Sequence, residues 1–197
     1  MPEFRSAVIL AGGKSTRMGF DKQLLQMQDE SIVLHLVTLL KTRFRDIMVS
    51  SATPELYAGI DVRVIQDLHQ DIGPLGGIHA ALCGARSEAV FVIACDMPYV
   101  EIAYIDYMVG ELAKGSYDAC VTQHGDYLEV FHSFFLRSAL PLLEEELAAG
   151  RHSVQRFTRK LDALIIPEEK AAPFLPGWRA FTNLNTPAEY EQFLGAK

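Results

Sequence analysis

Long apolar runs and cysteines are both scarce in this sequence. The longest apolar stretches, residues 32–40 and 89–94, are far shorter than the roughly 20 residues that a membrane-spanning helix needs. No apolar segment with a small-residue cleavage site stands at the N-terminus, so we expect neither a secretion signal nor a membrane partner. Cys83, Cys95 and Cys120 show no C-x-x-C spacing, and we expect buried, reduced thiols in a cytoplasmic protein.

Positive charge is scarce as well. Only 18 Lys and Arg residues oppose 25 Asp and Glu residues, which gives a net charge of -7. A nucleic-acid partner would require cations for many phosphates, so we expect none. The 197 residues are 49% hydrophobic, enough for a substantial core, and contain neither a linker nor an internal repeat. We therefore expect a single domain over residues 1–197.

Short apolar runs alternate with longer amphipathic stretches, which predicts an α/β fold with a mostly parallel central sheet and helices on both faces. The expected strands are residues 7–10, 46–50, 62–65, 89–94, 119–122, 128–135 and 164–166. The expected helices are residues 32–42, 77–85, 102–113, 139–149, 152–159 and 187–194. The proline-rich residues 167–177 predict an extended loop, and the acidic run 144–146 predicts a solvated helix face.

The segment after the first strand has the composition of a phosphate-binding loop. Residues 10–22 read LAGGKSTRMGFDK, which combines paired glycines with hydroxyl groups and cations. Glycines such as Gly12 and Gly13 let backbone N–H groups approach an anion, and Arg17 and Lys22 can bind phosphate oxygens. The NTPase P-loop is excluded, because Val8 stands where that motif requires its first glycine. The loop thus predicts a phosphate site at the carboxyl end of the first strand.

Asp96 directly follows the continuous apolar strand 89–94 and Cys95. A strand of this kind is covered on both faces. Because Asp96 comes just after its last residue, the Asp96 carboxylate lies at the carboxyl end of the strand. Because Mg²⁺ in phosphate sites is commonly held by one or two carboxylates together with phosphate oxygens and water, one aspartate beside a triphosphate is sufficient. A capping or turn-forming role for Asp96 is the alternative.

Two further segments carry polar candidates. Asp67 follows the third expected strand and precedes a glycine-rich turn, residues 73–77, in which Gly76 and its neighbours would let a base or ribose lie against the backbone. Asn183 and Asn185 alternate along an extended segment, so their side chains project to the same side. They could bind an acceptor or orient water, whereas turn and cap chemistry is the alternative for all three side chains.

These segments resemble the molybdenum cofactor guanylyltransferase (MobA) family of nucleotidyltransferases. Residues 10–22 look like its LAGGxSxRMGxDK motif, and three later segments follow in the family's order. They are Asp67 with residues 73–77 (GPLGG), residues 95–99 (CDMPY) and residues 183–187 (NLNTP). The first and third of the four segments also occur in other nucleotidyltransferases. The resemblance spans nearly the whole chain.

The resemblance implies a Rossmann-like three-layer nucleotidyltransferase fold. It also implies transfer of GMP from GTP to the terminal phosphate of molybdopterin, with Mg²⁺ as cofactor and pyrophosphate as leaving group. Molybdoenzymes and other cofactor-biosynthesis proteins are the implied protein partners. Family members often carry Asn just after the second strand, where this chain has Ser50 and Ser51.

The resemblance also assigns roles to individual positions. Arg17, Lys22 and Asp96 would be catalytic, and Asp96 would bind the metal. The substrate-binding positions would be Leu10, Ala11, Gly12, Gly13, Lys22, Ser50, Asp67, Gly76, Asp96, Arg151, Asn183 and Asn185. Among these, Arg151 resembles a family arginine near the acceptor phosphate, although its flanking sequence differs.

Two other functions remain open at this point. The first is the same chemistry with CTP, or with a sugar, cobinamide or polyol phosphate as acceptor. The LAGG sequence at residues 10–13 looks more like the guanylyltransferase version than the LAAG form of cytidylyltransferases. The second is a non-catalytic cofactor carrier, which could lose the metal carboxylate that this chain retains.

Overall fold

The computed structural model describes residues 4–12, 22–27, 30–67 and 72–195. Within these ranges the central sheet has seven strands in the order β5-β4-β1-β6-β8-β7-β9. They are β1 (Ser6–Leu10), β4 (Asp46–Ser50), β5 (Arg63–Ile65), β6 (Ala89–Ala94), β7 (Ala119–His124), β8 (Tyr127–Leu136) and β9 (Ala163–Ile166). Only β8 in this sheet runs antiparallel to its neighbours, so the expected mostly parallel sheet is confirmed.

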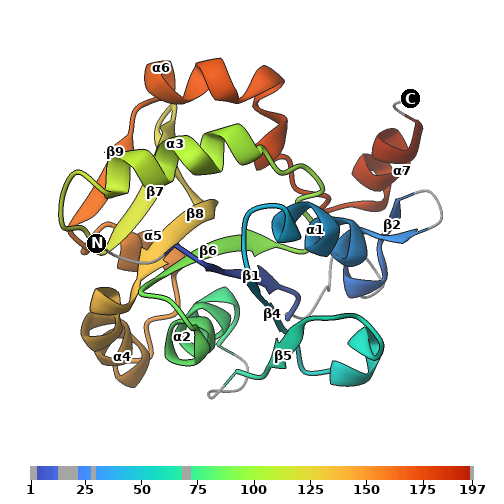
Figure 1. The fold of residues 1–197 in the computed structure, drawn as a ribbon, viewed down its shortest axis with the longest axis horizontal. Coiled ribbons are helices and arrows are strands. Elements are labelled where there is room, and N and C mark those ends of the chain that lie inside the picture. The colour runs from blue at the N-terminus through green and yellow to red at the C-terminus, as the bar shows by residue number, and fades with distance from the viewer. Residues whose placement is uncertain (1–3, 13–21, 28–29, 68–71, 196–197) are drawn as a thin grey trace.

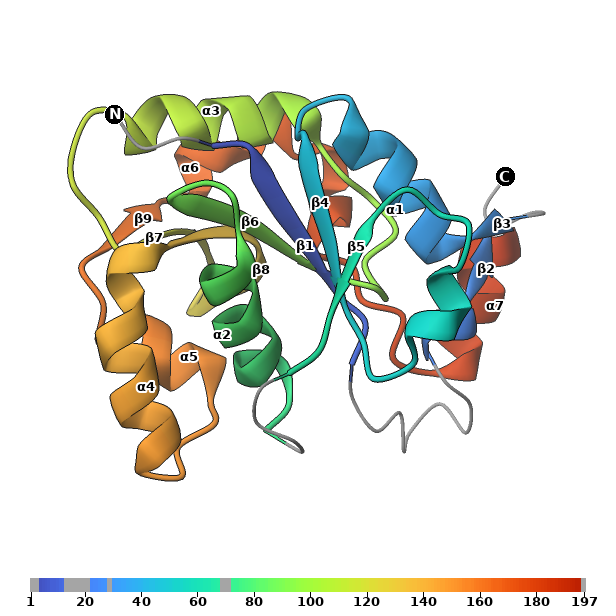
Figure 2. The ribbon, with the colours of Figure 1, turned by 60° about the horizontal axis from the view of Figure 1, so that its bottom comes forward.

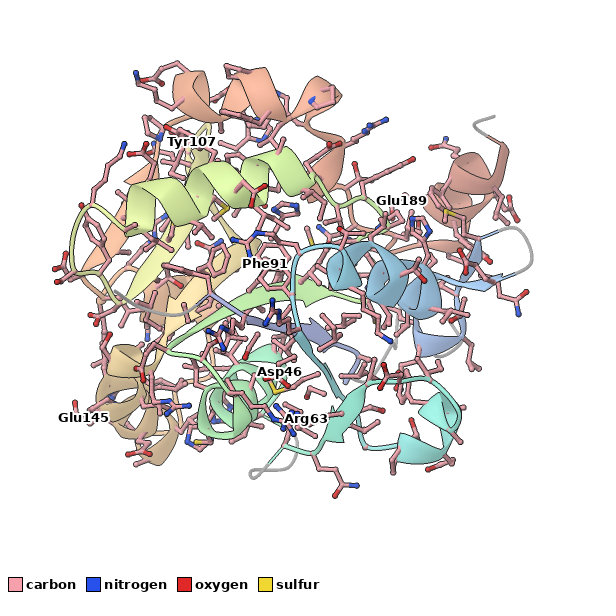
Figure 3. The ribbon with its side chains drawn as sticks, in the orientation of Figure 1. Asp46, Arg63, Phe91, Tyr107, Glu145 and Glu189 are labelled. Atoms are coloured by element: carbon pink, nitrogen blue, oxygen red, sulfur yellow. The ribbon has the colours of Figure 1, made fainter. Side chains whose placement is uncertain are left out.

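Helices cover both faces of the sheet and complete three layers (Figure 1). One layer contains α1 (Ile32–Lys41), α3 (Ile102–Leu112) and α6 (Glu168–Ala171). The other contains α2 (Pro74–Gly84), α4 (Leu140–Ala148) and α5 (Val154–Thr158), and α7 (Pro187–Gly195) lies beyond the end of α1. The apolar residues form two clusters, one on each side of the sheet, and the central Phe91 is fully buried in the first (Figure 3).

All seven expected strands and all six expected helices are present, with ends that shift by at most three residues. The sequence did not predict the small hairpin of β2 (Gln26–Met27) and β3 (Glu30–Ser31), or the 3₁₀ turns η1 (Lys22–Leu24), η2 (Pro54–Tyr57) and η3 (Arg137–Ala139). None of the helices in the described ranges has the length and apolar character that crossing a membrane requires.

The expected extended loop at residues 167–177 is wrong. This segment contains α6, followed by the 3₁₀ turns η4 (Ala172–Phe174) and η5 (Pro176–Phe181). Its prolines are compatible with helix because Pro167 precedes α6 and the other two stand in the first turn of η4 and of η5. Proline is tolerated in a first turn, where its missing N–H would have no helical acceptor.

Two smaller expectations also need correction. Glu146 does not belong to a solvated face, because it is only 1% exposed and accepts hydrogen bonds from Arg151 and Lys160, each at 2.7 Å. Its neighbour Glu145 does point outward from α4 (Figure 3). Cys83 is exposed, whereas Cys95 and Cys120 are buried as expected, and no disulfide joins the three.

Candidate functional site

The carboxyl ends of β4, β1 and β6 lie side by side and bring three sequence segments together. Leu10 pairs with Ser50 on one side and with Ala94 on the other. Beyond the strands, the Ala11 N–H donates to the Ser50 carbonyl at 2.9 Å, and the Cys95 N–H donates to the Leu10 carbonyl at 3.0 Å. The start of the glycine-rich loop is therefore fixed between the ends of its two neighbouring strands (Figure 2).

Asp96 is placed at this edge by the end of β6 and is 7% exposed. Its carbonyl accepts a hydrogen bond from the Leu184 N–H at 2.9 Å, which joins the segment before α7 to the end of β6. Lys22 Nζ lies 2.5 Å from Asp96 Oδ2 and 2.8 Å from Asn185 Oδ1. Three predicted site residues, from distant parts of the chain, are thus in direct contact.

Lys22 is held in place through its neighbour Gln23. The Gln23 Oε1 accepts hydrogen bonds from the hydroxyl groups of Ser51 at 2.6 Å and Tyr57 at 2.8 Å, and a longer one from Thr53. These hydroxyl groups come from the segment after β4, so they attach η1 to the carboxyl edge of the sheet. No sequence motif pointed to Gln23.

An open cavity of about 260 Å³ lies at this edge. Its lining residues are Leu10, Ala11, Gly12, Lys22, Pro74, Ala94, Cys95, Asp96, Phe131, Asn183 and Asn185. Seven of these were predicted as site residues, and the alternation of Asn183 and Asn185 does direct both towards the same cavity. Phe131 was not predicted, because it comes from the middle of an ordinary apolar strand.

Ser50 and Asp67, which were predicted separately, form a pair. The Ser50 hydroxyl donates to Asp67 Oδ1 at 2.7 Å, and Ser50 is only 2% exposed. Gly77 in α2 allows this close packing, because a Cβ there would lie 2.8 Å from Leu10 Cδ2 and 2.9 Å from Ser50 Oγ. The serine that stands in the family's Asn region therefore orients an aspartate carboxylate.

The remaining predicted residues lie elsewhere. Gly13 and Arg17 fall outside the described residues. Gly76 is buried in the first turn of α2 and does not line the cavity. Arg151 does not line it either, and its guanidinium group binds Glu146 through Nε at 3.0 Å and Nη2 at 2.7 Å.

The donor set at Asp96 fits a hard divalent cation that also binds phosphate. Asp96 Oδ1 is buried and accepts no hydrogen bond within the described part of the chain. Burying a carboxylate oxygen without a partner is costly, so an oxygen of this kind is suited to binding a cation. No cluster of three His, Cys, Asp or Glu side chains suitable for a metal occurs among the described residues. Phosphate oxygens and water would therefore supply most ligands.

Comparison with known proteins agrees with the expected fold and family. Residues 7–164 match the family described as "MobA-like NTP transferase domain". The molybdenum cofactor guanylyltransferase of Syntrophotalea carbinolica is 44% identical over 97% of this chain and 91% of its own length. A probable molybdenum cofactor guanylyltransferase of Peptoclostridium acidaminophilum is 37% identical over 96% and 88%, respectively.

A solved structure shows the same arrangement. Molybdopterin-guanine dinucleotide biosynthesis protein A from Archaeoglobus fulgidus superimposes with a TM-score of 0.86 at 25% identity, over 96% of this chain and 97% of that one. The three-layer fold is that of a nucleotidyltransferase. Within that class, the chain belongs to the MobA-like NTP transferase family.

Proposed function

We propose that this protein transfers GMP from GTP to the terminal phosphate of molybdopterin. In this reaction a phosphate oxygen of the acceptor attacks the α-phosphorus of GTP, the bond to the bridging oxygen breaks, and pyrophosphate leaves. The product is the guanine dinucleotide form of the cofactor. The contact of Lys22 with Asp96 and Asn185 at one cavity edge is the observation that carries the proposal.

The acceptor phosphate is already an anionic nucleophile, so the site must neutralise charge and align two substrates. Lys22 provides one cation at the cavity, and the resemblance assigns a second to Arg17, which lies outside the described residues. When bound at Asp96, Mg²⁺ would supply further positive charge to the phosphates. Asn185 keeps the Lys22 ammonium group at the mouth of the cavity through the 2.8 Å hydrogen bond.

The nucleoside would lie on the β4 side of β1, where the Ser50–Asp67 pair stands. An aspartate oriented by a buried hydroxyl group can accept hydrogen bonds from a ribose or from base N–H groups. The molybdenum cofactor guanylyltransferases among the relatives favour guanine as the base. Free GTP and reduced cysteines both favour the cytoplasm as the place of the reaction.

The decisive experiment measures pyrophosphate release with molybdopterin as acceptor and GTP, CTP, ATP or UTP as donor, each with Mg²⁺. We expect release with GTP, and a loss on the order of 10²-fold or more for Asp96→Ala. A thermal-shift series with the same nucleotides should show stabilisation by GTP. Stabilisation and turnover with CTP alone would show that CTP, and not GTP, is the donor. GTP binding without turnover would indicate a non-catalytic carrier. Near wild-type Mg²⁺-dependent release by Asp96→Ala would refute the role of Asp96.

A further inference from the structure

One wall of the cavity is aromatic, and it comes from β8. The pairing of β8 with β6 ends at Val92 and Ser133, although β6 continues for two more residues to Ala94. The two strands therefore separate at the point where the cavity begins. Phe131 lies just beyond this last pair and lines the cavity together with Ala94 and Cys95.

A backbone irregularity in β8 fixes the direction of Phe131. Leu128 and Val130 pack in the cluster under α2 and α4, whereas Phe134 and Leu136 pack in the cluster on the opposite face. Residues two apart on a regular strand share one face, so β8 must change phase between Val130 and Phe134. His132 lies at this position with φ of 60°, a conformation that side-chain-bearing residues rarely adopt.

The surroundings of His132 hold this conformation. Its ring is buried, lies edge-on to Phe91 at 5.0 Å between ring centres, and accepts a hydrogen bond from the Glu101 N–H at 3.3 Å through Nε2. Burial lowers the pKa of His132 to about 4, so the imidazole is neutral at physiological pH. Strained backbone persists only where its environment enforces it, so these contacts hold the backbone next to Phe131 in place.

The Phe131 ring has no aromatic partner among the described residues, whereas two other phenylalanines of β8 do. Phe134 packs against Phe91 at 5.3 Å, and Phe135 stacks on Phe157 at 6.1 Å. Phe131 itself is half-buried and faces the cavity. A flat ligand could therefore stack on it without displacing another ring.

The strand order separates this wall from the proposed nucleoside position. Ser50 and Asp67 stand beyond β1 on the β4 and β5 side, whereas Phe131 stands beyond β6 on the β8 side, with Asp96 between them. We propose that Phe131 is the stacking platform for the planar part of the acceptor's fused heterocycle, a ring system of the pterin class. This inference rests on the proposed function, because it assigns the acceptor half of the same cavity.

Asn183 lines the same cavity and suits the polar edge of such a ring. Its Nδ2 donates to the Phe181 carbonyl at 3.2 Å, which orients the amide. Its Oδ1 accepts no hydrogen bond within the described residues, so this oxygen can accept one from a heterocycle N–H. Stacking plus one directed hydrogen bond is a common way to recognise a flat nitrogen heterocycle.

The test compares Phe131→Leu and Phe131→Trp with the wild type, and uses Phe174→Leu as the matched control. Phe174 is also half-buried and stacks on Tyr107 at 4.7 Å, but it does not line the cavity. Two readouts are needed. The first is the KM for molybdopterin and for GTP, and the second is the binding of free 6-carboxypterin, which is measured by the quenching of its fluorescence. The second readout needs no turnover.

We expect Phe131→Leu to raise the molybdopterin KM and weaken 6-carboxypterin binding, each by about 10-fold to 100-fold, with the GTP KM unchanged. Phe131→Trp should restore both, and Phe174→Leu should change neither. Unchanged pterin binding in Phe131→Leu, or an equal loss of GTP binding, overturns the inference.

If the wild type transfers no GMP to molybdopterin, the proposed function fails. In that case, the stacking role of Phe131 is still supported if the wild type binds 6-carboxypterin and Phe131→Leu does not. If neither protein binds 6-carboxypterin, the inference is overturned.

Discussion

Lys22 and Asp96 are 74 residues apart in the sequence, yet Lys22 Nζ lies 2.5 Å from Asp96 Oδ2 at the edge of the cavity. The pair has unequal exposure, with 23% of the lysine side chain and 10% of the aspartate side chain accessible. Because the buried Asp96 Oδ1 accepts no hydrogen bond from the described residues, only one oxygen of the carboxylate is paired. The two side chains therefore form a unit in which Asp96 can bind a cation and Lys22 can bind a phosphate.

Substitutions in this unit should not have additive effects. We expect Lys22→Ala and Asp96→Ala each to lower kcat on the order of 10²-fold, and the double variant to lose little more than either one. Pyrophosphate release with GTP and molybdopterin measures all three. Lys170→Ala, an exposed lysine in α6, is the control and should retain full activity. Losses that multiply in the double variant would show that the two residues act independently.

Gly77 and Gly110 provide a matched pair of helical glycines. A Cβ at Gly77 would lie 2.8 Å from Leu10 Cδ2 and 2.9 Å from Ser50 Oγ, whereas a Cβ at Gly110 would meet nothing within 4 Å beyond its chain neighbours and its own helix backbone. We expect Gly110→Ala to stabilise the protein by up to about 1 kcal/mol through helix propensity. Gly77→Ala should destabilise it by about 1–3 kcal/mol because of overpacking. Urea unfolding measures both changes.

Gly77→Ala should also raise the GTP KM, because the added methyl group displaces the Ser50 hydroxyl from Asp67. Gly110→Ala should leave that KM unchanged. Stabilisation by both substitutions would contradict the close packing of α2 against Leu10 and Ser50.

The sheet and its principal helices were predictable because apolar runs, turn residues and helical periodicity are local sequence patterns that indicate strands and helices directly. The register of β1 with β4 and β6 then explains why Asp96 and the start of the glycine-rich loop meet. Phe131 was not predictable, since its role depends on where β8 leaves β6 and on the positive φ of His132. Those features arise from three-dimensional packing and leave no periodic signal.

Glu146 shows a second limit of sequence patterns. A run of three glutamates on an amphipathic helix is usually solvated, and Glu144 and Glu145 follow that rule. Glu146 is buried because Arg151 and Lys160, both beyond the helix, fold back onto its carboxylate. Local periodicity carries no information about partners that the next turn and helix supply.

Arg151 and Lys160 allow a direct test of the predicted acceptor contact. Both bind Glu146 Oε1 at 2.7 Å, but Arg151 has a second guanidinium edge, and its Nη1 makes no hydrogen bond within the described residues. We expect Arg151→Ala and Lys160→Ala to lower the melting temperature similarly. The acceptor role that the resemblance implies requires Arg151→Ala, and not Lys160→Ala, to raise the molybdopterin KM. Because Arg151 does not line the cavity at Lys22 and Asp96, where the acceptor phosphate would react, we expect both variants to keep the wild-type KM.

The position of Arg151 makes this test informative. The turn between α4 and α5, which contains Arg151, lies on the far side of α2 from β1 (Figures 1 and 2), so a higher molybdopterin KM in Arg151→Ala alone would show that the acceptor extends past α2. Equal KM values in the two variants would restrict Arg151 to stabilising Glu146.

The lowered pKa of Asp46 leads to a prediction of how the stability of the protein depends on pH. It begins β4, is 5% exposed, and lies beside Arg63 (Figure 3). Burial alone would raise the pKa of Asp46, but hydrogen bonds from Ser6, Arg63 and the Arg86 N–H, together with the charge of Arg63, outweigh burial and lower it. The folded state thus favours the ionised carboxylate more strongly than the unfolded state does.

The direction of the pH effect follows from this lowered pKa. The ionised Asp46 contributes its full stability above the unfolded pKa of about 4, and this contribution is lost as the pH falls through the lower folded pKa. We expect Asp46→Asn to lower the free energy of unfolding by about 2 kcal/mol at pH 7, with the difference from wild type shrinking below about pH 4. Denaturant unfolding at pH 3 to 7 measures this.

Asp61→Asn is the matched control for Asp46→Asn. Asp61 also pairs with a cation, Lys41 at 2.8 Å, but its side chain is 97% exposed, so solvent screens the interaction. Its variant should unfold like the wild type at every pH. Because Asp46 lies at the amino end of β4, opposite the cavity, its variant should keep the wild-type KM for GTP wherever it is folded. A pH-independent loss of stability in Asp46→Asn would show that shape and packing, and not charge, account for the contribution of Asp46.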